Sequence, residues 1–153
     1  MNVVFENVSL SGSPAASGRA RGKILIVDDE PQVRELIAAS LRAGGYDKFI
    51  FGCSGSVVPT LVLRENPQLI IMDVMMPGGN GLRALRTLKS SPDTAGIPVI
   101  MTSGFMVQSP GTSAWDQADY LLAKPFKPAQ LLATVEQLLQ GERRMQTPEM
   151  ERV

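Results

Sequence analysis

The sequence contains no histidine, and this absence narrows the chemistry open to the protein. A histidine general base, histidine ligands to zinc and a phosphohistidine carried by this chain are all excluded. Cys53 is the only cysteine, so no disulfide can form within the chain, and a reducing compartment is expected. No apolar run is long enough to span a bilayer, and the first 22 residues lack the unbroken apolar core of a signal peptide. These absences predict a cytoplasmic protein without a membrane partner.

An excess of charge is absent as well, because 15 Lys and Arg residues balance 15 Asp and Glu residues. Without a basic field the chain has no general attraction for nucleic acid, so no direct nucleic-acid partner is expected. The 153 residues suffice for one ordinary domain. We expect a flexible N-terminal extension at residues 1–22, the domain at 23–140, and a short polar tail at 141–153 that is too small for an output module.

Short apolar runs are present, and they predict strands. The clearest is Leu69–Asp73, in which four apolar residues lead directly into a carboxylate, and Pro77 then stops the strand. Continuous apolar runs bounded by turn residues are typical of strands buried on both faces of a parallel sheet. The other predicted strands are Lys23–Val27, Phe49–Gly52, Pro98–Thr102 and Tyr120–Ala123.

Segments with helical spacing of apolar residues separate these strands. Four of them are expected to begin at Pro31, Ser56, Gly81 and Pro128. The fourth helix in chain order should lie within Phe105–Asp119, where Pro110 and Gly111 predict a shortened or irregular helix. Because strands and helices alternate five times, we predict an α/β fold, a (βα)5 doubly wound sheet of five parallel strands.

Side chains with charge or hydroxyl chemistry follow four of the strands, namely Asp28 and Asp29, Asp73, Ser103 and Lys124. The carboxyl ends of parallel strands meet at one edge of the sheet, so these side chains are expected to converge. Carboxylates brought together repel one another unless a cation joins them, and Mg²⁺ commonly binds one or two carboxylates together with phosphate oxygens. Asp73 is then a candidate nucleophile for an acyl phosphate, and Lys124 a candidate partner for the phosphoryl group.

Each of these signals also has a simpler structural explanation. An Asp-Asp pair before a helix is more often an N-cap, Lys-Pro is usually an exposed turn, and Ser-Gly is usually a loop. The case for a site depends on the combination of all four signals in order along alternating strands.

The sequence resembles the response-regulator receiver domain of two-component signalling in four motifs: IVDDE, IIMDVMMPGGNG, IPVIMTSG and YLLAKPF. The resemblance covers about Lys23 to Gln140. It implies the flavodoxin-like, CheY-like fold with strand order 2-1-3-4-5.

The resemblance also implies a role for each matching residue at the acidic end of the sheet. Asp73 would accept a phosphoryl group from the phosphohistidine of a histidine kinase or a histidine phosphotransfer protein. Asp29, Asp73 and the backbone carbonyl of Met75 would coordinate Mg²⁺ directly, and Asp28 would do so through water.

Ser103 would hydrogen-bond the phosphoryl group and Lys124 would pair with it, with a cis bond between Lys124 and Pro125. The family usually has an aromatic residue three positions before the lysine, where this chain has Leu121. Tyr120 is one position away and is therefore expected on the opposite face of the strand, so coupling by the usual rotation of an aromatic ring is not expected.

The implied function is that of a stand-alone response regulator, which catalyses only its own phosphorylation and dephosphorylation. It would switch the binding of a downstream protein through the face formed by the fourth helix, fifth strand and fifth helix, and that face could also form a homodimer. One alternative is a degenerate receiver that binds partners without phosphorylation. Another is a metal phosphatase with an aspartyl nucleophile, which would need a second acid at the position of Met75.

Overall fold

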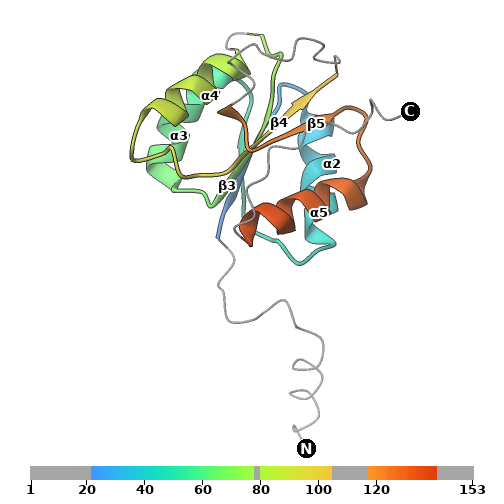
Figure 1. Cartoon of the computed structure of the whole chain (residues 1–153). Helices are drawn as coiled ribbons and strands as arrows, with labels where there is room; N and C mark the ends of the chain where they lie inside the picture. The colour runs from blue at the N-terminus through green and yellow to red at the C-terminus, as the bar shows by residue number, and fades with distance from the viewer. Residues whose placement is uncertain (1–21, 78–79, 105–116, 141–153) are drawn as a thin grey trace, which may run out of the picture.

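The protein is described from a computed structural model at residues 22–77, 80–104 and 117–140. Five parallel strands form one sheet in the order β2-β1-β3-β4-β5 (Figure 1). The strands are β1 (Ile24–Val27), β2 (Phe49–Gly52), β3 (Leu69–Asp73), β4 (Val99–Ser103) and β5 (Tyr120–Ala123). The predicted parallel sheet and its strand order are confirmed.

Helices cover both faces of this sheet (Figure 1). On one face, α2 (Pro31–Arg42) packs beside α5 (Pro128–Leu139). On the other lie α3 (Val58–Glu65), preceded by the 3₁₀ turn η2 (Gly55–Val57), and α4 (Gly81–Ser90). The predicted helix starting at Ser56 is therefore a 3₁₀ turn followed by an α-helix, in which Pro59 occupies the first turn because it has no N–H to donate.

The fourth helix predicted from the sequence is a different segment from the one labelled α4. Residues 105–116, which hold most of that prediction together with Pro110, Gly111 and Trp115, lie outside the described residues, as do residues 1–21 and 141–153. In the part of the chain that is described, no helix combines the length and the apolar character needed to cross a membrane.

Alternate side chains of the strands pack into two apolar clusters, one on each face of the sheet. Leu25, Ile70 and Met101 point toward α3 and α4, whereas their neighbours along the strands point toward α2 and α5. All positions of β1, β3 and β4 are buried, which accounts for the continuous apolar runs in the sequence.

The register of β5 places Tyr120 and Leu121 on opposite faces of the sheet. Leu121 pairs with Met101 and packs in the cluster under α3 and α4. Tyr120 packs in the cluster under α2 and α5. Ser103, two residues beyond Met101 on the same strand, therefore shares its face with Leu121 and not with Tyr120. The prediction that the aromatic ring lies away from Ser103 is confirmed.

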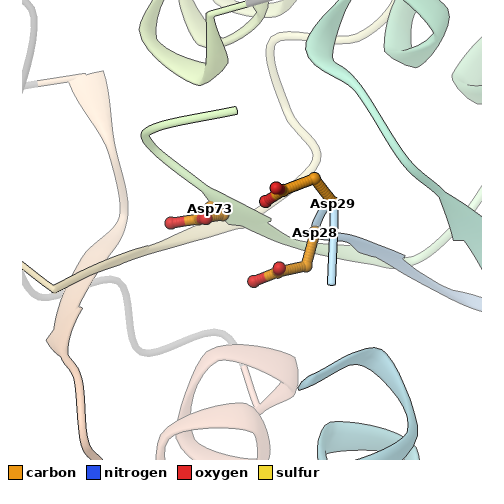
Figure 2. Close-up of side chains that lie close together, drawn as sticks. All are labelled: Asp28, Asp29 and Asp73. Carbon is orange, nitrogen blue, oxygen red and sulfur yellow. The ribbon is translucent and has the colours of Figure 1, made fainter. Parts of the chain in front are cut away.

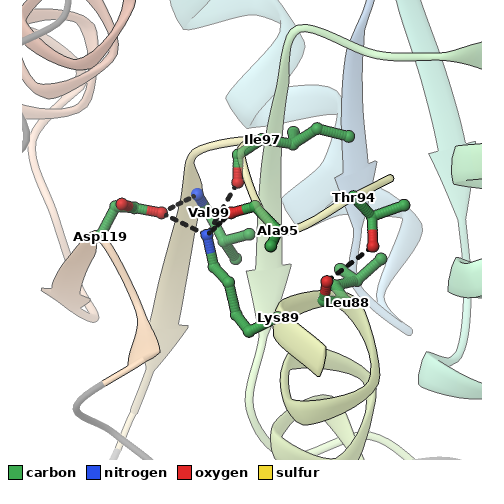
Figure 3. Close-up of polar contacts among 7 residues, drawn as sticks. All are labelled: Leu88, Lys89, Thr94, Ala95, Ile97, Val99 and Asp119. Atoms are coloured by element: carbon green, nitrogen blue, oxygen red, sulfur yellow. Dashed lines mark hydrogen bonds and ion pairs between the residues drawn. The ribbon is translucent and has the colours of Figure 1, made fainter. Parts of the chain in front are cut away.

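A nearly buried ion pair closes the opposite edge of the sheet, where β4 and β5 begin (Figure 3). The ammonium of Lys89, in the last turn of α4, donates to the backbone carbonyls of Ala95 and Ile97 at 3.1 and 3.0 Å and to Asp119 Oδ2 at 3.0 Å. The same carboxylate oxygen accepts from the N–H of Val99 at 2.8 Å. Three oxygens thus match the three donors of the ammonium, and they tie α4 to the starts of β4 and β5.

Candidate functional site

The structure brings the side chains of Asp28, Asp29, Asp73 and Lys124 together at the carboxyl edge of the sheet. The three carboxylates each place an oxygen within 4.8 Å of the others. Figure 2 shows them reaching from the ends of β1 and β3 into the same space. Lys124 Nζ lies 2.9 Å from Asp28 Oδ2 and 3.4 Å from Asp73 Oδ2. One lysine therefore contacts two of the three acids, and the cluster carries excess negative charge.

Asp28 is fully buried, and the structure shows that it does not cap the following helix. The N-cap of α2 is Glu30, without a side-chain capping bond. Asp28 Oδ1 instead accepts from the Glu30 N–H at 2.9 Å, and Oδ2 accepts from Lys124. The backbone N–H of Asp28 donates to the carbonyl of Gly52 at 3.1 Å. The simpler explanation of the Asp-Asp pair as an N-cap is therefore wrong.

Burial and neighbouring charges shift the pKa values of the facing groups. Burial of Asp73, reinforced by the charge of Asp28, raises the pKa of Asp73 even though Lys124 opposes the shift. Burial alone would lower the pKa of Lys124, but its hydrogen bond and ion pair with Asp28 outweigh this effect and raise it. The ionised form of Asp73 is therefore unfavourable in this cluster, and a bound cation would stabilise it.

The raised pKa of Asp73 predicts a pH-dependent effect of Asp73→Asn on stability in the absence of metal. The folded state binds the Asp73 proton more tightly than the unfolded chain, so the ionised side chain lowers stability above the folded pKa. This loss disappears as the pH falls through the folded pKa toward the unfolded value. Asp73→Asn should therefore resist urea better than wild type at neutral pH with EDTA present, and the advantage should shrink on acidification. An advantage that stays constant with pH would contradict the shift.

The remaining predicted residues surround the acids. Ser103 ends β4 and is buried, and its carbonyl accepts from the Lys124 N–H at 2.7 Å. The bond between Lys124 and Pro125 is cis, the form that the resemblance to the receiver family implies. Met75 follows β3 and is 60% exposed. It borders a hollow that is lined by Val74, Met75, Met76, Pro77 and Asn80.

The donor set fits a hard divalent cation. Asp28, Asp29 and Asp73 offer only oxygen ligands, which Mg²⁺ prefers, and the partly exposed Asp29 leaves a side open to water and to phosphate oxygens. The residues present therefore match the magnesium site that the sequence predicts.

Gly81, which no motif in the sequence marks as a site residue, holds α4 against the backbone of Asp73. Its N–H donates to the carbonyl of Val74 at 3.0 Å, and Asn80 caps the helix by accepting from the N–H of Leu82 at 2.7 Å. A Cβ at Gly81 would overlap the carbonyl oxygen of Asp73. The close approach is a tertiary contact, and the sequence signals it only by a glycine at the start of a helix.

We expect Gly81→Ala to lower the free energy of unfolding by about 1–3 kcal/mol, because backbone atoms must move to admit the methyl group. Gly44→Ala is the matched control, since the three atoms nearest to its Cβ all belong to the side chain of Leu132, which can shift more easily than backbone. Urea unfolding of both variants measures the difference. Equal losses in the two variants would show that the Asp73 backbone does not constrain Gly81.

The fold and the site define a class of protein: a doubly wound five-stranded α/β domain with an acidic cluster and a lysine at the carboxyl edge of its sheet. The sequence matches the family model of the response regulator receiver domain over residues 24–136. The chain belongs to this family of two-component signalling domains.

Curated relatives include longer proteins. The DNA-binding response regulator MtrA of Mycolicibacterium smegmatis is 35% identical over 116 residues, which cover 75% of this chain and 49% of MtrA. The phosphate regulon transcriptional regulatory protein PhoB of Pseudomonas aeruginosa is 33% identical, with 76% of this chain and 51% of PhoB covered. The chain thus spans about half the length of these relatives.

Solved structures agree on the fold. The chemotaxis response regulator CheY4 of Vibrio cholerae superposes with a TM-score of 0.69 at 24% identity, covering 78% of this chain and 99% of CheY4. The receiver domain of the sensor histidine kinase PA1611 of Pseudomonas aeruginosa gives a TM-score of 0.71 at 26% identity, covering 80% and 100%. That structure has a magnesium ion coordinated in its active-site cleft.

Proposed function

We propose that this receiver domain, residues 23–140, accepts a phosphoryl group on Asp73 in a Mg²⁺-dependent reaction and thereby switches its binding to another protein. One observation carries the proposal: three carboxylates from two strands lie within 4.8 Å of one another, beside a single lysine. Such a cluster is costly without a cation, and with one it can receive a phosphoryl group.

The reaction uses Asp73 as the nucleophile. One of its carboxylate oxygens attacks the phosphorus of a phosphohistidine, a P–O bond forms as the P–N bond breaks, and the imidazole of the donor leaves with the bonding electrons and takes up a proton. Since this chain has no histidine, the donor imidazole belongs to a histidine kinase or a phosphotransfer protein. Lys124, which already contacts Asp28 and Asp73, offsets charge on the incoming phosphoryl oxygens.

The residues that would hold Mg²⁺ are Asp29, Asp73, the carbonyl of Met75 and, through water, Asp28. When bound, the ion supplies positive charge that screens the carboxylates from the approaching phosphoryl oxygens. The carboxylates themselves fix the place of the ion relative to the attacking oxygen of Asp73.

The switch is proposed to begin at Ser103 and Lys124, whose strands are joined at that point by the hydrogen bond from the Lys124 N–H to the Ser103 carbonyl. Ser103 would hydrogen-bond the phosphoryl group and draw the end of β4 toward it. Leu121 on β5 lies on the same face of the sheet as Ser103 and has no aromatic ring. The conformational change would therefore be transmitted through an aliphatic side chain. The DNA binding in the name of MtrA belongs to that longer protein; the partner proposed here is a protein.

The intrinsic fluorescence of Trp115, the single tryptophan, tests this proposal. Beryllium fluoride with Mg²⁺ mimics the phosphoryl group and should change the emission of wild type, whereas Asp73→Asn should give no change. Beryllium fluoride without Mg²⁺ should also leave the wild-type emission unchanged. A wild type that responds to neither treatment and stays unphosphorylated with acetyl phosphate would support the alternative, a receiver that binds partners without phosphorylation.

A further inference from the structure

Asp28 directly follows β1, and each of its polar groups has a partner. Its N–H donates to the carbonyl of Gly52, and its two carboxylate oxygens accept from the Glu30 N–H and from Lys124. Its backbone carbonyl has no ladder partner in β2, whose last residue is Gly52, opposite Val27. Arg34 Nη1 donates to this carbonyl at 2.6 Å from the second turn of α2. The guanidinium is partly buried, so the bond is shielded from competing water.

The peptide bond that carries this carbonyl also carries the N–H of Asp29. Because a peptide is planar, fixing the Asp28 carbonyl fixes the direction in which the chain leaves toward Asp29. Among residues 22–77, 80–104 and 117–140, no hydrogen bond or ion pair restrains the Asp29 carboxylate itself. The place of this carboxylate in the cluster therefore depends on the backbone on either side of it.

We propose that Arg34 is a positioning residue of the metal site: through the Asp28 carbonyl it holds the peptide plane that places Asp29 within reach of Asp28 and Asp73. This inference deepens the proposed function and rests on it, because it concerns the same Mg²⁺ site. Residues that orient metal ligands without binding the metal themselves typically contribute about ten- to a hundredfold to metal affinity.

Loss of the positive charge of Arg34 and loss of its hydrogen bond should change the Mg²⁺ affinity in opposite directions. Removing a positive charge near three carboxylates would strengthen their attraction for a cation if nothing moved. Loss of the hydrogen bond would free the peptide plane and weaken the site. A weaker Mg²⁺ affinity in a variant that lacks the positive charge is therefore the signature of positioning.

The experiment compares Arg34→Gln and Arg34→Lys with wild type by titration with Mg²⁺ in a calorimeter. We expect the dissociation constant of Arg34→Gln to rise about tenfold or more. Arg34→Lys should recover part of the affinity, because an ammonium can donate to one carbonyl without the fixed geometry of the guanidinium. Arg86→Gln is the matched control, since Arg86 is exposed on α4 and the substitution removes the same charge.

A measurement on the metal-free protein complements the titration. Hydrogen exchange of the Glu30 amide, which donates to Asp28 Oδ1, should become faster in Arg34→Gln, while exchange in β3 stays as in wild type. Suppose that wild type binds Mg²⁺ and that Asp29→Asn binds it more weakly. Unchanged or tighter Mg²⁺ binding by Arg34→Gln would then overturn the proposed role of Arg34 and leave the proposed function intact. A wild type that binds no Mg²⁺ would overturn the proposed function and this inference together.

Discussion

Asp73→Asn should reduce phosphorylation by acetyl phosphate to background, the largest functional effect expected of any single substitution in this chain. The amide cannot act as the nucleophile, and it removes one of the three carboxylates of the cluster. Intact-mass spectrometry after incubation with acetyl phosphate and Mg²⁺ measures the effect. Because Asp73 is buried beside Asp28 with a raised pKa, the variant should remain folded and be more stable than wild type without metal.

Asp93→Asn is the matched control for this substitution. Asp93 is exposed in the loop after α4, so its substitution removes the same charge without touching the cluster, and phosphorylation should match that of wild type. Phosphorylation of Asp73→Asn at the wild-type rate would mean that another residue accepts the group. Loss of phosphorylation in both variants would point to an effect of net charge.

Lys89→Met should cause the largest loss of stability, about 3 kcal/mol or more in the free energy of unfolding. Both side chains of its ion pair with Asp119 are only 11% exposed, and removal of the ammonium leaves a buried carboxylate with the Val99 N–H but without its cation. The carbonyls of Ala95 and Ile97 lose their donor at the same time. Urea unfolding followed by circular dichroism measures the loss.

Lys23→Met provides the comparison for a surface ion pair. Lys23 Nζ lies 2.9 Å from Glu65 Oε1, close to the 3.0 Å of the Lys89 pair, but the side chains are 46% and 25% exposed, so the pair should contribute less than about 1 kcal/mol. Similar losses in Lys89→Met and Lys23→Met would show that burial does not set the energetic weight of the Lys89 pair. The double variant Lys89→Met with Asp119→Asn should lose less stability than the sum of the losses of its two single variants, because it leaves no unpaired carboxylate at position 119.

The sheet was predictable from the sequence because β1, β3 and β4 are buried on both faces and therefore read as continuous apolar runs. The convergence of Asp28, Asp73 and Lys124 followed from the same reasoning, since parallel strands present their carboxyl ends at one edge. The helix starts at Pro31 and Pro128 were predictable because proline is favoured in the first turn.

Contacts that depend on three-dimensional packing were not predictable. Nothing local marks Arg34 as the partner of the Asp28 carbonyl, because an arginine on an amphipathic helix is usually solvated. The pairing of Lys89 with Asp119 joins residues 30 positions apart, and only the fold brings them together. The split of the predicted helix at Ser56 into η2 and α3 depends on the local backbone around Pro59, which apolar spacing does not reveal.

The central claim, that Asp73 carries the phosphoryl group, is tested most directly by locating the modification. The protein is incubated with acetyl phosphate and Mg²⁺, reduced with borohydride, digested and sequenced by mass spectrometry. Borohydride converts an aspartyl phosphate into homoserine, so homoserine at position 73, dependent on Mg²⁺, is the predicted result. Homoserine at another aspartate, or no reduced residue in a protein that binds Mg²⁺ normally, would contradict it.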